Sequence, residues 1–210
     1  MLSTSKTPSK QPAAPVASSL EEDRIQSSLA SFYASLRSID AQLRQLVGPE
    51  RLAVDKTLTK AVRLELLVKN DGKLYPTGEI EHIETECLHE INRRLLATGR
   101  AVKALTDGYQ QLLQAYRDLD SVCGELDWSK ENSELMAGSS RQKPLEYYLQ
   151  EGYRIVHQLN GLVVGFELTF NAIEIRDSSS VQRFRDCLTI SEELQLYLQE
   201  YLSYAIFLLK

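Results

Sequence analysis

The chain has 210 residues, of which 43% are hydrophobic and 25% are charged. This composition is close to that of ordinary globular domains and excludes a wholly disordered chain, which would have fewer apolar residues and a larger net charge. The formal net charge is −5, with 24 Lys and Arg against 29 Asp and Glu. We therefore expect no direct binding of nucleic acid, because such binding relies on basic side chains that neutralise phosphates.

Residues 1–18 are predicted to form a disordered N-terminal tail. They are mostly Ser, Thr, Pro, Lys, Gln and Ala and offer almost nothing to bury. Thr7 is followed by Pro8, Ser9 and Lys10, which is the order that proline-directed, cyclin-dependent kinases prefer. Thr7 is therefore the predicted phosphorylation site, where added charge would not disturb a core.

Residues 19–69 are predicted to form a pair of heptad helices. In the first helix, over 20–47, apolar residues recur at spacings of four and three and form one seam. The seam consists of Ile25, Leu29, Phe32, Leu36, Ile39, Leu43 and Leu46. Gly48-Pro49 is predicted to end this helix, because proline lacks an amide hydrogen and disfavours helix in the preceding residue. The second helix is predicted from about Pro49 to Val68.

Residues 79–210 are predicted to form a long helical hairpin plus a C-terminal helix. Apolar residues alternate by three and four over 79–124, which indicates a helix of about five heptads. A polar connector follows, and Pro144 suits the first turn of a second arm over 144–176. Ser179 is predicted to cap one last helix, whose seam includes Tyr197, Tyr201 and Tyr204.

The strict seams predict an all-α fold, namely an elongated antiparallel helical bundle or a set of coiled-coil hairpins. In this interpretation the two hairpin arms pack on each other and leave the helix over 20–47 without an evident internal partner. Its seam is therefore the predicted surface for binding another helical protein. The tyrosines of the last helix are a second candidate interface, with an intramolecular aromatic core as the favoured alternative.

No pattern in the sequence predicts an enzyme. Gly-rich phosphate-binding loops and the GxSxG and HExxH patterns are all absent. The segment 79–89 holds two Glu-x-x-His pairs of the di-iron type, but they lie on one helix about 10 Å apart and cannot close around one metal pair. His157 is predicted to be a partly buried packing residue. We expect no catalytic residue, no cofactor, no metal and no small-molecule substrate.

The three cysteines, Cys87, Cys123 and Cys187, are odd in number and none has CxxC spacing. They predict a reducing, intracellular setting. The first residues contain no apolar run of the kind found in a secretory signal. No stretch approaches the roughly 20 apolar residues that a membrane-spanning helix needs, so we expect no membrane span.

A series of features from Glu84 to the end has a familiar order. Glu84-x-Glu-Cys-Leu-His-Glu-Ile-Asn is followed by Leu105-Thr106 through Leu119, then by Cys123-Gly124-Glu125-Leu126, a polar connector and a Tyr-rich helix from Tyr147. In this order the chain resembles the cyclin-dependent-kinase-2-interacting protein family over about half its length. The resemblance implies a small nuclear adaptor linked to replication, checkpoint signalling and an AAA-ATPase ribosome-maturation complex.

These observations predict a non-enzymatic coiled-coil adaptor or structural subunit, which binds other helical subunits in a hetero-oligomer. Chromosome, cell-division or replication-checkpoint machinery is the favoured setting, and the nucleus is favoured over the cytoplasm. Thr7-Pro8 points the same way. The alternatives are a subunit of a vesicle or organelle tethering complex and an accessory factor of an AAA-ATPase ribosome-maturation complex.

Overall fold

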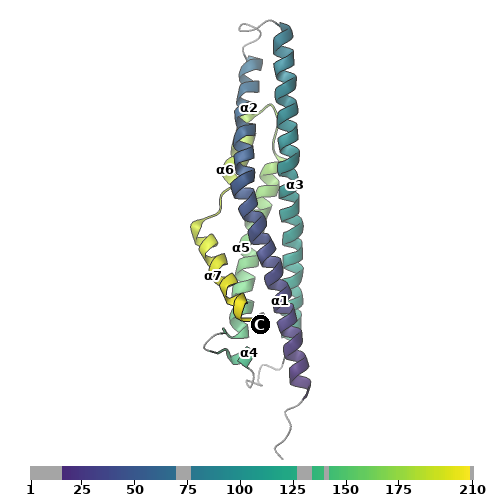
Figure 1. The fold of residues 1–210 in the computed structure, drawn as a ribbon, viewed down its shortest axis with the longest axis vertical. Helices are drawn as coiled ribbons and strands as arrows, with labels where there is room; N and C mark the ends of the chain where they lie inside the picture. Colours follow the sequence, from purple (N-terminus) through teal and green to yellow (C-terminus); the bar gives the residue numbers. More distant parts are fainter. Residues whose placement is uncertain (1–15, 70–76, 127–133, 140–141, 209–210) are drawn as a thin grey trace, which may run out of the picture.

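The structure of the chain is a computed structural model, which describes residues 16–69, 77–126, 134–139 and 142–208 (Figure 1). All regular elements in these residues are helices, which confirms the all-α prediction. Thr7 and residues 1–15 of the predicted tail lie outside the described residues. Residues 16–18 were predicted to belong to that tail but are helical.

The chain begins with a continuous helical rod. Helix α1 (Val16–Gln45) leads into a π-helical turn (η1, Leu46–Glu50), and α2 (Arg51–Lys69) follows at once. The prediction that Gly48-Pro49 ends the first helix is therefore wrong. Pro49 lies inside the π-helical turn. The wider winding of this turn accommodates a residue without an amide hydrogen, so the chain continues in the same direction.

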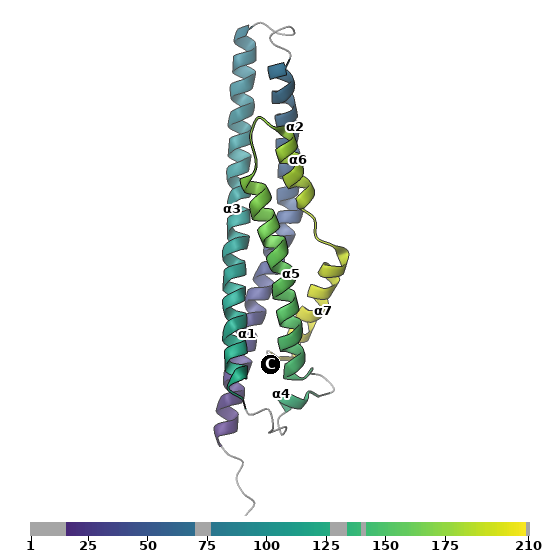
Figure 2. The same ribbon diagram turned by 180° about the vertical axis from the view of Figure 1, so that it is seen from behind.

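The remaining helices complete an up-down-up-down bundle. Helix α3 (Thr77–Gly124) runs antiparallel to the rod, and its 48 residues make about 70 Å of helix at 1.5 Å per residue. After the short α4 (Glu134–Ala137), α5 (Leu145–Asn171) runs back beside α3. Helices α6 (Ser178–Cys187) and α7 (Glu192–Leu208) then run down, α6 against α2 and α5, and α7 against α1 (Figure 2).

The predicted single last helix is interrupted between α6 and α7. Leu188 is buried there, and the Ser191 hydroxyl accepts a hydrogen bond from the Leu194 amide at 3.2 Å, which caps α7. The cap of α6 also differs from the prediction. It is Asp177, whose carboxylate accepts a hydrogen bond from the Ser179 amide at 3.0 Å.

The predicted division into a helix pair over 19–69 and a separate unit over 79–210 does not describe the packing. Helices α1 and α2 lie in line, and both pack along α3. A single hydrophobic cluster contains buried residues from all seven α-helices of the described chain. The chain reverses only after α2, so the two parts share one core instead of forming two.

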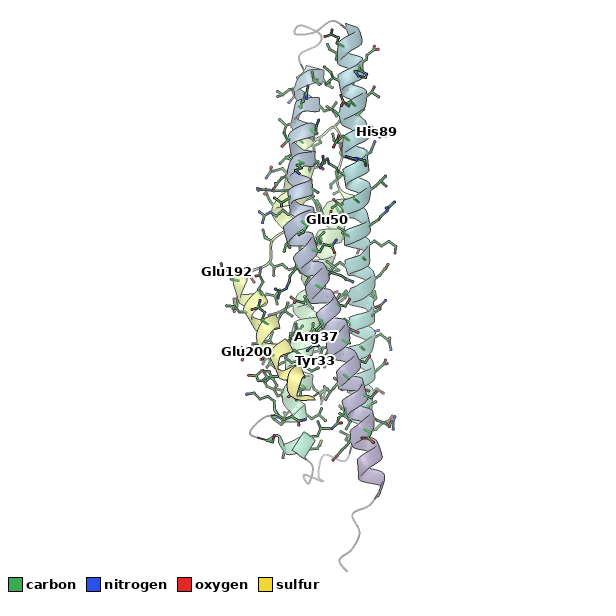
Figure 3. All side chains as sticks on the ribbon, in the orientation of Figure 1. Tyr33, Arg37, Glu50, His89, Glu192 and Glu200 are labelled. Carbon is green, nitrogen blue, oxygen red and sulfur yellow. The ribbon has the colours of Figure 1, made fainter. Side chains whose placement is uncertain are left out.

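The two ends of the bundle differ in the number of helices that pack together. At one end, α2 and α3 extend beyond α5 and α6 (Figures 1 and 2). Below this extension, Glu50 lies at the junction of the rod, facing α3 (Figure 3), and accepts a hydrogen bond from the buried Thr98 hydroxyl at 3.3 Å. Ion pairing of Arg185 with Asp55, at 2.9 Å, joins α6 to α2.

Candidate protein-interaction surface

The predicted docking seam of the first helix is core in this fold. None of its residues is more than 1% exposed, and they belong to the same cluster as the seams of α3 and α5. The seam comprises Ile25, Leu29, Phe32, Leu36, Ile39, Leu43 and Leu46. Because α1 packs along α3 and α7, its apolar side already has partners within the chain. The seam is therefore not available as a surface for another protein.

The tyrosines of the last helix join an aromatic cluster between α1, α5 and α7. Tyr201 is fully buried, its ring stacks on that of Tyr33 at 5.1 Å between centroids, and its hydroxyl donates a hydrogen bond to the Tyr148 carbonyl at 2.8 Å. Figure 3 shows Tyr33 on α1 at the level of α7. Tyr201 is therefore a core residue, in agreement with the alternative of an intramolecular aromatic core.

The other two tyrosines of α7, Tyr197 and Tyr204, are half-buried and contact side chains of α5. The Tyr197 hydroxyl donates a hydrogen bond to the Glu151 carboxylate. The Tyr204 ring lies edge-on to that of Tyr147 at 5.7 Å, and the Lys143 ammonium lies 5.3 Å from both ring centroids. Both tyrosines thus contact the chain itself, which accounts for the seam without an external partner.

Burial makes the cluster unsuited to acid–base or nucleophilic chemistry. It raises the pKa values of Tyr33 and Tyr201 far above the ordinary value, and it raises the pKa of Tyr116 and of Tyr147 to about 12. It also raises the pKa of the buried Cys123 thiol to about 11. These groups stay neutral at physiological pH, so the cluster's role is to hold α1, α5 and α7 together and, through Tyr116 against Phe32, to join them to α3.

A groove between α3 and α5 is the most distinctive surface feature of the described chain. It has a volume of about 360 Å³, which lies within the range of roughly 300–1,000 Å³ typical of ligand pockets. Its lining comprises Tyr109, Leu113, Tyr116 and Arg117 of α3 and Tyr153, Val156, His157 and Asn160 of α5. Aromatic rings therefore dominate it, with a few polar groups at the edge.

Hydrogen bonds between the two helices fix the floor of the groove. The Tyr109 hydroxyl donates to the Val156 carbonyl at 3.3 Å, and the Tyr116 hydroxyl donates to the Leu149 carbonyl at 3.2 Å. Tyr116 also packs edge-on against Phe32, with centroids 5.7 Å apart. The groove is thus built on the same aromatic core that joins α1, α5 and α7, and its shape does not depend on a loop.

The rim of the groove carries an exposed aromatic pair. Tyr153 is 60% exposed, and its ring lies parallel to the exposed His157 ring, with centroids 6.3 Å apart and an interplanar angle of 7°. The prediction that His157 is a partly buried packing residue is therefore wrong. It lies one position after the seam residue Val156, on the outer side of α5.

The charge of the groove is positive and unbalanced. Arg117 forms no ion pair or hydrogen bond with any residue that the structure describes, and its charge acts on the Tyr109 phenol. No carboxylate lines the groove. Two other cations of these helices are paired locally: Lys103 with Asp107 at 3.0 Å and Arg154 with Glu151 at 2.8 Å.

Exposed apolar side chains continue this face along both helices. Val164 follows His157 by one heptad on α5, and Leu168 lies one turn further. Leu96 precedes Arg117 on α3 by a whole number of heptads and so lies on the same side. The exposed fractions of Leu96, Val164 and Leu168 are 66%, 41% and 64%. We call the groove together with these three residues the α3–α5 face.

Exposed apolar residues also occur on α2. Leu52, Val62 and Val68 are 63%, 42% and 51% exposed. They lie along the convex surface of one helix and do not belong to the lining of the groove between α3 and α5. A second groove of about 270 Å³, between α1 and α3, is lined by Gln, Glu, Ala and Arg side chains. The α2 residues are absent from the lining of both grooves, and the lining of the second groove contains no aromatic side chain.

The described residues include no group of three or more His, Cys, Asp or Glu side chains arranged to hold a metal ion. Within the same residues, no helix combines the length and hydropathy that crossing a membrane requires. The chain matches no protein-family model, no curated protein and no solved structure in the comparisons made. The α3–α5 face therefore has to be interpreted from its own chemistry.

Sequence patterns identified the tyrosines near the start of α5 but missed the groove. Arg117, His157 and Asn160 lie off the apolar seams, at positions that solvent normally covers. One signal was present in the sequence: Tyr153, His157, Asn160 and Val164 recur at spacings of four and three beside the seam of α5. This second stripe widens the apolar side of the helix beyond what one neighbour covers.

Proposed function

We propose that this chain is a non-enzymatic helical subunit, which binds another protein through the α3–α5 face. One observation carries the proposal: a preformed groove lined by tyrosine rings continues into exposed Leu and Val side chains on both helices that form it. Exposed apolar patches of this kind, edged by polar residues, mark interaction sites in soluble proteins. Tyr and Arg are also the residue types most enriched at the centre of protein interfaces.

The architecture supports a role as a rigid binding element. The seams of α1, α3 and α5 are used within the chain, so the core is complete without another subunit. The α3–α5 face instead uses positions outside the seams, which the fold does not need. An adaptor of this design keeps its shape when free and offers one face to its partner, which reduces the entropy lost on binding.

The setting that we propose is a nuclear assembly, in cell-division, replication-checkpoint or ribosome-maturation machinery. The Thr7-Pro8 sequence and the resemblance to the cyclin-dependent-kinase-2-interacting protein family both favour it. A vesicle or organelle tethering complex is the alternative. Identification of the chains that co-purify with the tagged protein distinguishes these settings, since recovery of tethering subunits alone would contradict a nuclear role.

The binding surface is tested with two matched double variants of the tagged full-length chain. Val164→Glu with Leu168→Glu places two charges on the α3–α5 face. Val62→Glu with Leu52→Glu makes the same changes on α2, at positions with nearly identical exposure: 42% and 63% against 41% and 64%. The α3–α5 variant should lose the co-purifying partner, because a carboxylate cannot be buried in an apolar contact without a large desolvation penalty.

The α2 variant is the control and should retain the partner. All four changes are at exposed positions, so both variants should keep the helical circular dichroism of the parent chain. Loss of the partner in the α2 variant alone would contradict the proposal and assign binding to α2. Full retention in both variants would exclude each of these faces.

A further inference from the structure

The α3–α5 face also indicates what kind of partner it accommodates. The groove runs between two antiparallel helices that pack side by side. The lining of the groove on α3 runs from Tyr109 to Arg117, about 12 Å at 1.5 Å per residue, and the whole α3–α5 face runs from Leu96 to Arg117, about 30 Å. A groove of two helical turns within a longer apolar face fits a third helix, which binds through side chains spaced at i, i+3, i+4 and i+7.

The lining of the groove selects for apolar or aromatic anchors. The rings of Tyr109 and Tyr116 form the floor, with their hydroxyls bound to carbonyls of α5. Because Tyr109 is only 4% exposed, a partner would contact mainly the rings of the half-buried Tyr116 and the exposed Tyr153. A volume of about 360 Å³ has room for one or two large side chains but not for a folded domain.

The charge of the groove sets a further requirement for the partner that binds there. Arg117 is exposed without an ion-pair partner among the described residues, His157 lines the groove from α5, and no carboxylate belongs to the lining. An acidic side chain at this point would form the ion pair that Arg117 lacks. A basic side chain would meet an unbalanced positive charge, and like charges placed together disfavour binding strongly.

We propose that the α3–α5 face binds an amphipathic helix of a partner protein, which packs Leu or aromatic anchors against the contacting rings of Tyr116 and Tyr153, whose centroids are 6.3 Å apart, and places an Asp or Glu against Arg117. This inference rests on the proposed function, because it specifies the partner of the same face. A second copy of this chain, an extended peptide and a basic helix are the competing occupants. Each of them gives a different result in the following experiment.

The occupant is identified by photo-crosslinking of the full-length chain in the cells that naturally express it. Tyr153 is replaced by p-benzoylphenylalanine, which keeps an aromatic ring at the rim of the groove. The control carries the same photo-crosslinking residue at Ala41, an exposed position on α1 that does not line the groove. Cross-linked peptides are then sequenced by mass spectrometry.

The expected product is a cross-link that depends on position 153 and joins the chain to a segment with helical apolar spacing and neighbouring Asp or Glu residues. Arg117→Glu should then reduce the yield at least about tenfold, as expected for like charges in contact. Replacing the partner's facing carboxylate by Lys should restore it. Arg117 is exposed and makes no ion pair with any residue that the structure describes, so its reversal should not unfold the chain.

Other products contradict the inference in distinguishable ways. A cross-link to a second copy of this chain, to a basic helix or to a segment without helical spacing would overturn the acidic-helix partner. A cross-link to a second copy would also contradict the proposed hetero-oligomer. A cross-link to a basic helix or to a non-helical segment would still support the α3–α5 face as the docking surface. Equal yields at positions 153 and 41, or no product at position 153, would overturn both this inference and the proposed function.

Discussion

Two tyrosines that stack in the core differ in one respect, namely the fate of their hydroxyls. The Tyr201 hydroxyl donates to the Tyr148 carbonyl at 2.8 Å, whereas the buried Tyr33 hydroxyl faces the Tyr201 hydroxyl but makes no hydrogen bond of ordinary geometry with the described residues. Tyr33→Phe should therefore raise the free energy of unfolding by about 1 kcal/mol, and Tyr201→Phe should lower it by about 1 kcal/mol. Urea unfolding of both variants measures the difference, and equal effects would contradict it.

The same phenols predict how stability depends on pH. Burial raises the pKa of Tyr116 and Tyr147 to about 12, against 10.0 for an exposed tyrosine, and also raises the pKa of Tyr201 well above 10.0. Below about pH 10 the folded and unfolded chains both keep these protons. As the pH rises through about 10 to 12, only the unfolded chain releases them, so the free energy of unfolding should fall.

Unfolding midpoints measured between about pH 8 and pH 11 test this dependence, which follows from the phenol pKa values. Tyr201→Phe removes one of the groups that keep their proton in the folded state, so this variant should show a smaller loss than the parent chain. Equal losses in both chains would show that another group titrates.

At single residues, the sequence predicts burial well and surface function poorly. Heptad spacing alone placed Leu29, Leu36 and Leu43 in a seam, and all three are buried. The same spacing does not show whether the seam packs within this chain or against a partner protein, because both arrangements bury the same residues. Arg117 and His157 were missed for the opposite reason, since exposure off the seam depends on which helices lie alongside.

Within α5, two glycines with different surroundings provide a matched test of the packing. A Cβ at Gly161 would have no atom within 4 Å, whereas a Cβ at Gly152 would lie 3.2 Å from the Tyr201 hydroxyl and 3.3 Å from the Phe32 ring. Gly161→Ala should raise the free energy of unfolding by about 1 kcal/mol through helix propensity. Gly152→Ala should lower it, because buried rings on two other helices would have to move. Similar stabilisation by both would contradict the tight contact at Gly152.

The predicted helix boundaries agree with the structure where side-chain periodicity determines them. They differ from it where tertiary packing determines where a helix ends. The long helix predicted over 79–124 is α3, within two residues at its start. Pro49 was predicted to stop a helix, but the continuous packing of α1 and α2 on α3 carries the rod past it in a π-helical turn. Leu188 was predicted to lie inside a helix, but its burial accompanies the break between α6 and α7.

For the whole molecule, the shared core predicts that no part folds alone. Deletion of residues 20–47 removes the seam of α1, against which α3 and α7 pack. This deletion should abolish the cooperative unfolding of 79–210 as well as partner binding, because it exposes the apolar seam of α3. Circular dichroism melting of the shortened chain tests this, and a cooperative transition like that of the full chain would show that 79–210 is independent.

Whether the α3–α5 face is occupied in the assembled state is measured most directly by histidine labelling. Diethyl pyrocarbonate modifies exposed imidazoles. His157 is exposed on this face, and His82 is exposed near the start of α3. His82 is about 20 Å beyond Leu96 at 1.5 Å per residue and serves as an internal control. In the purified complex, labelling of His157 should fall several-fold relative to the free chain while labelling of His82 stays the same. Unchanged labelling of His157 would contradict binding at this face.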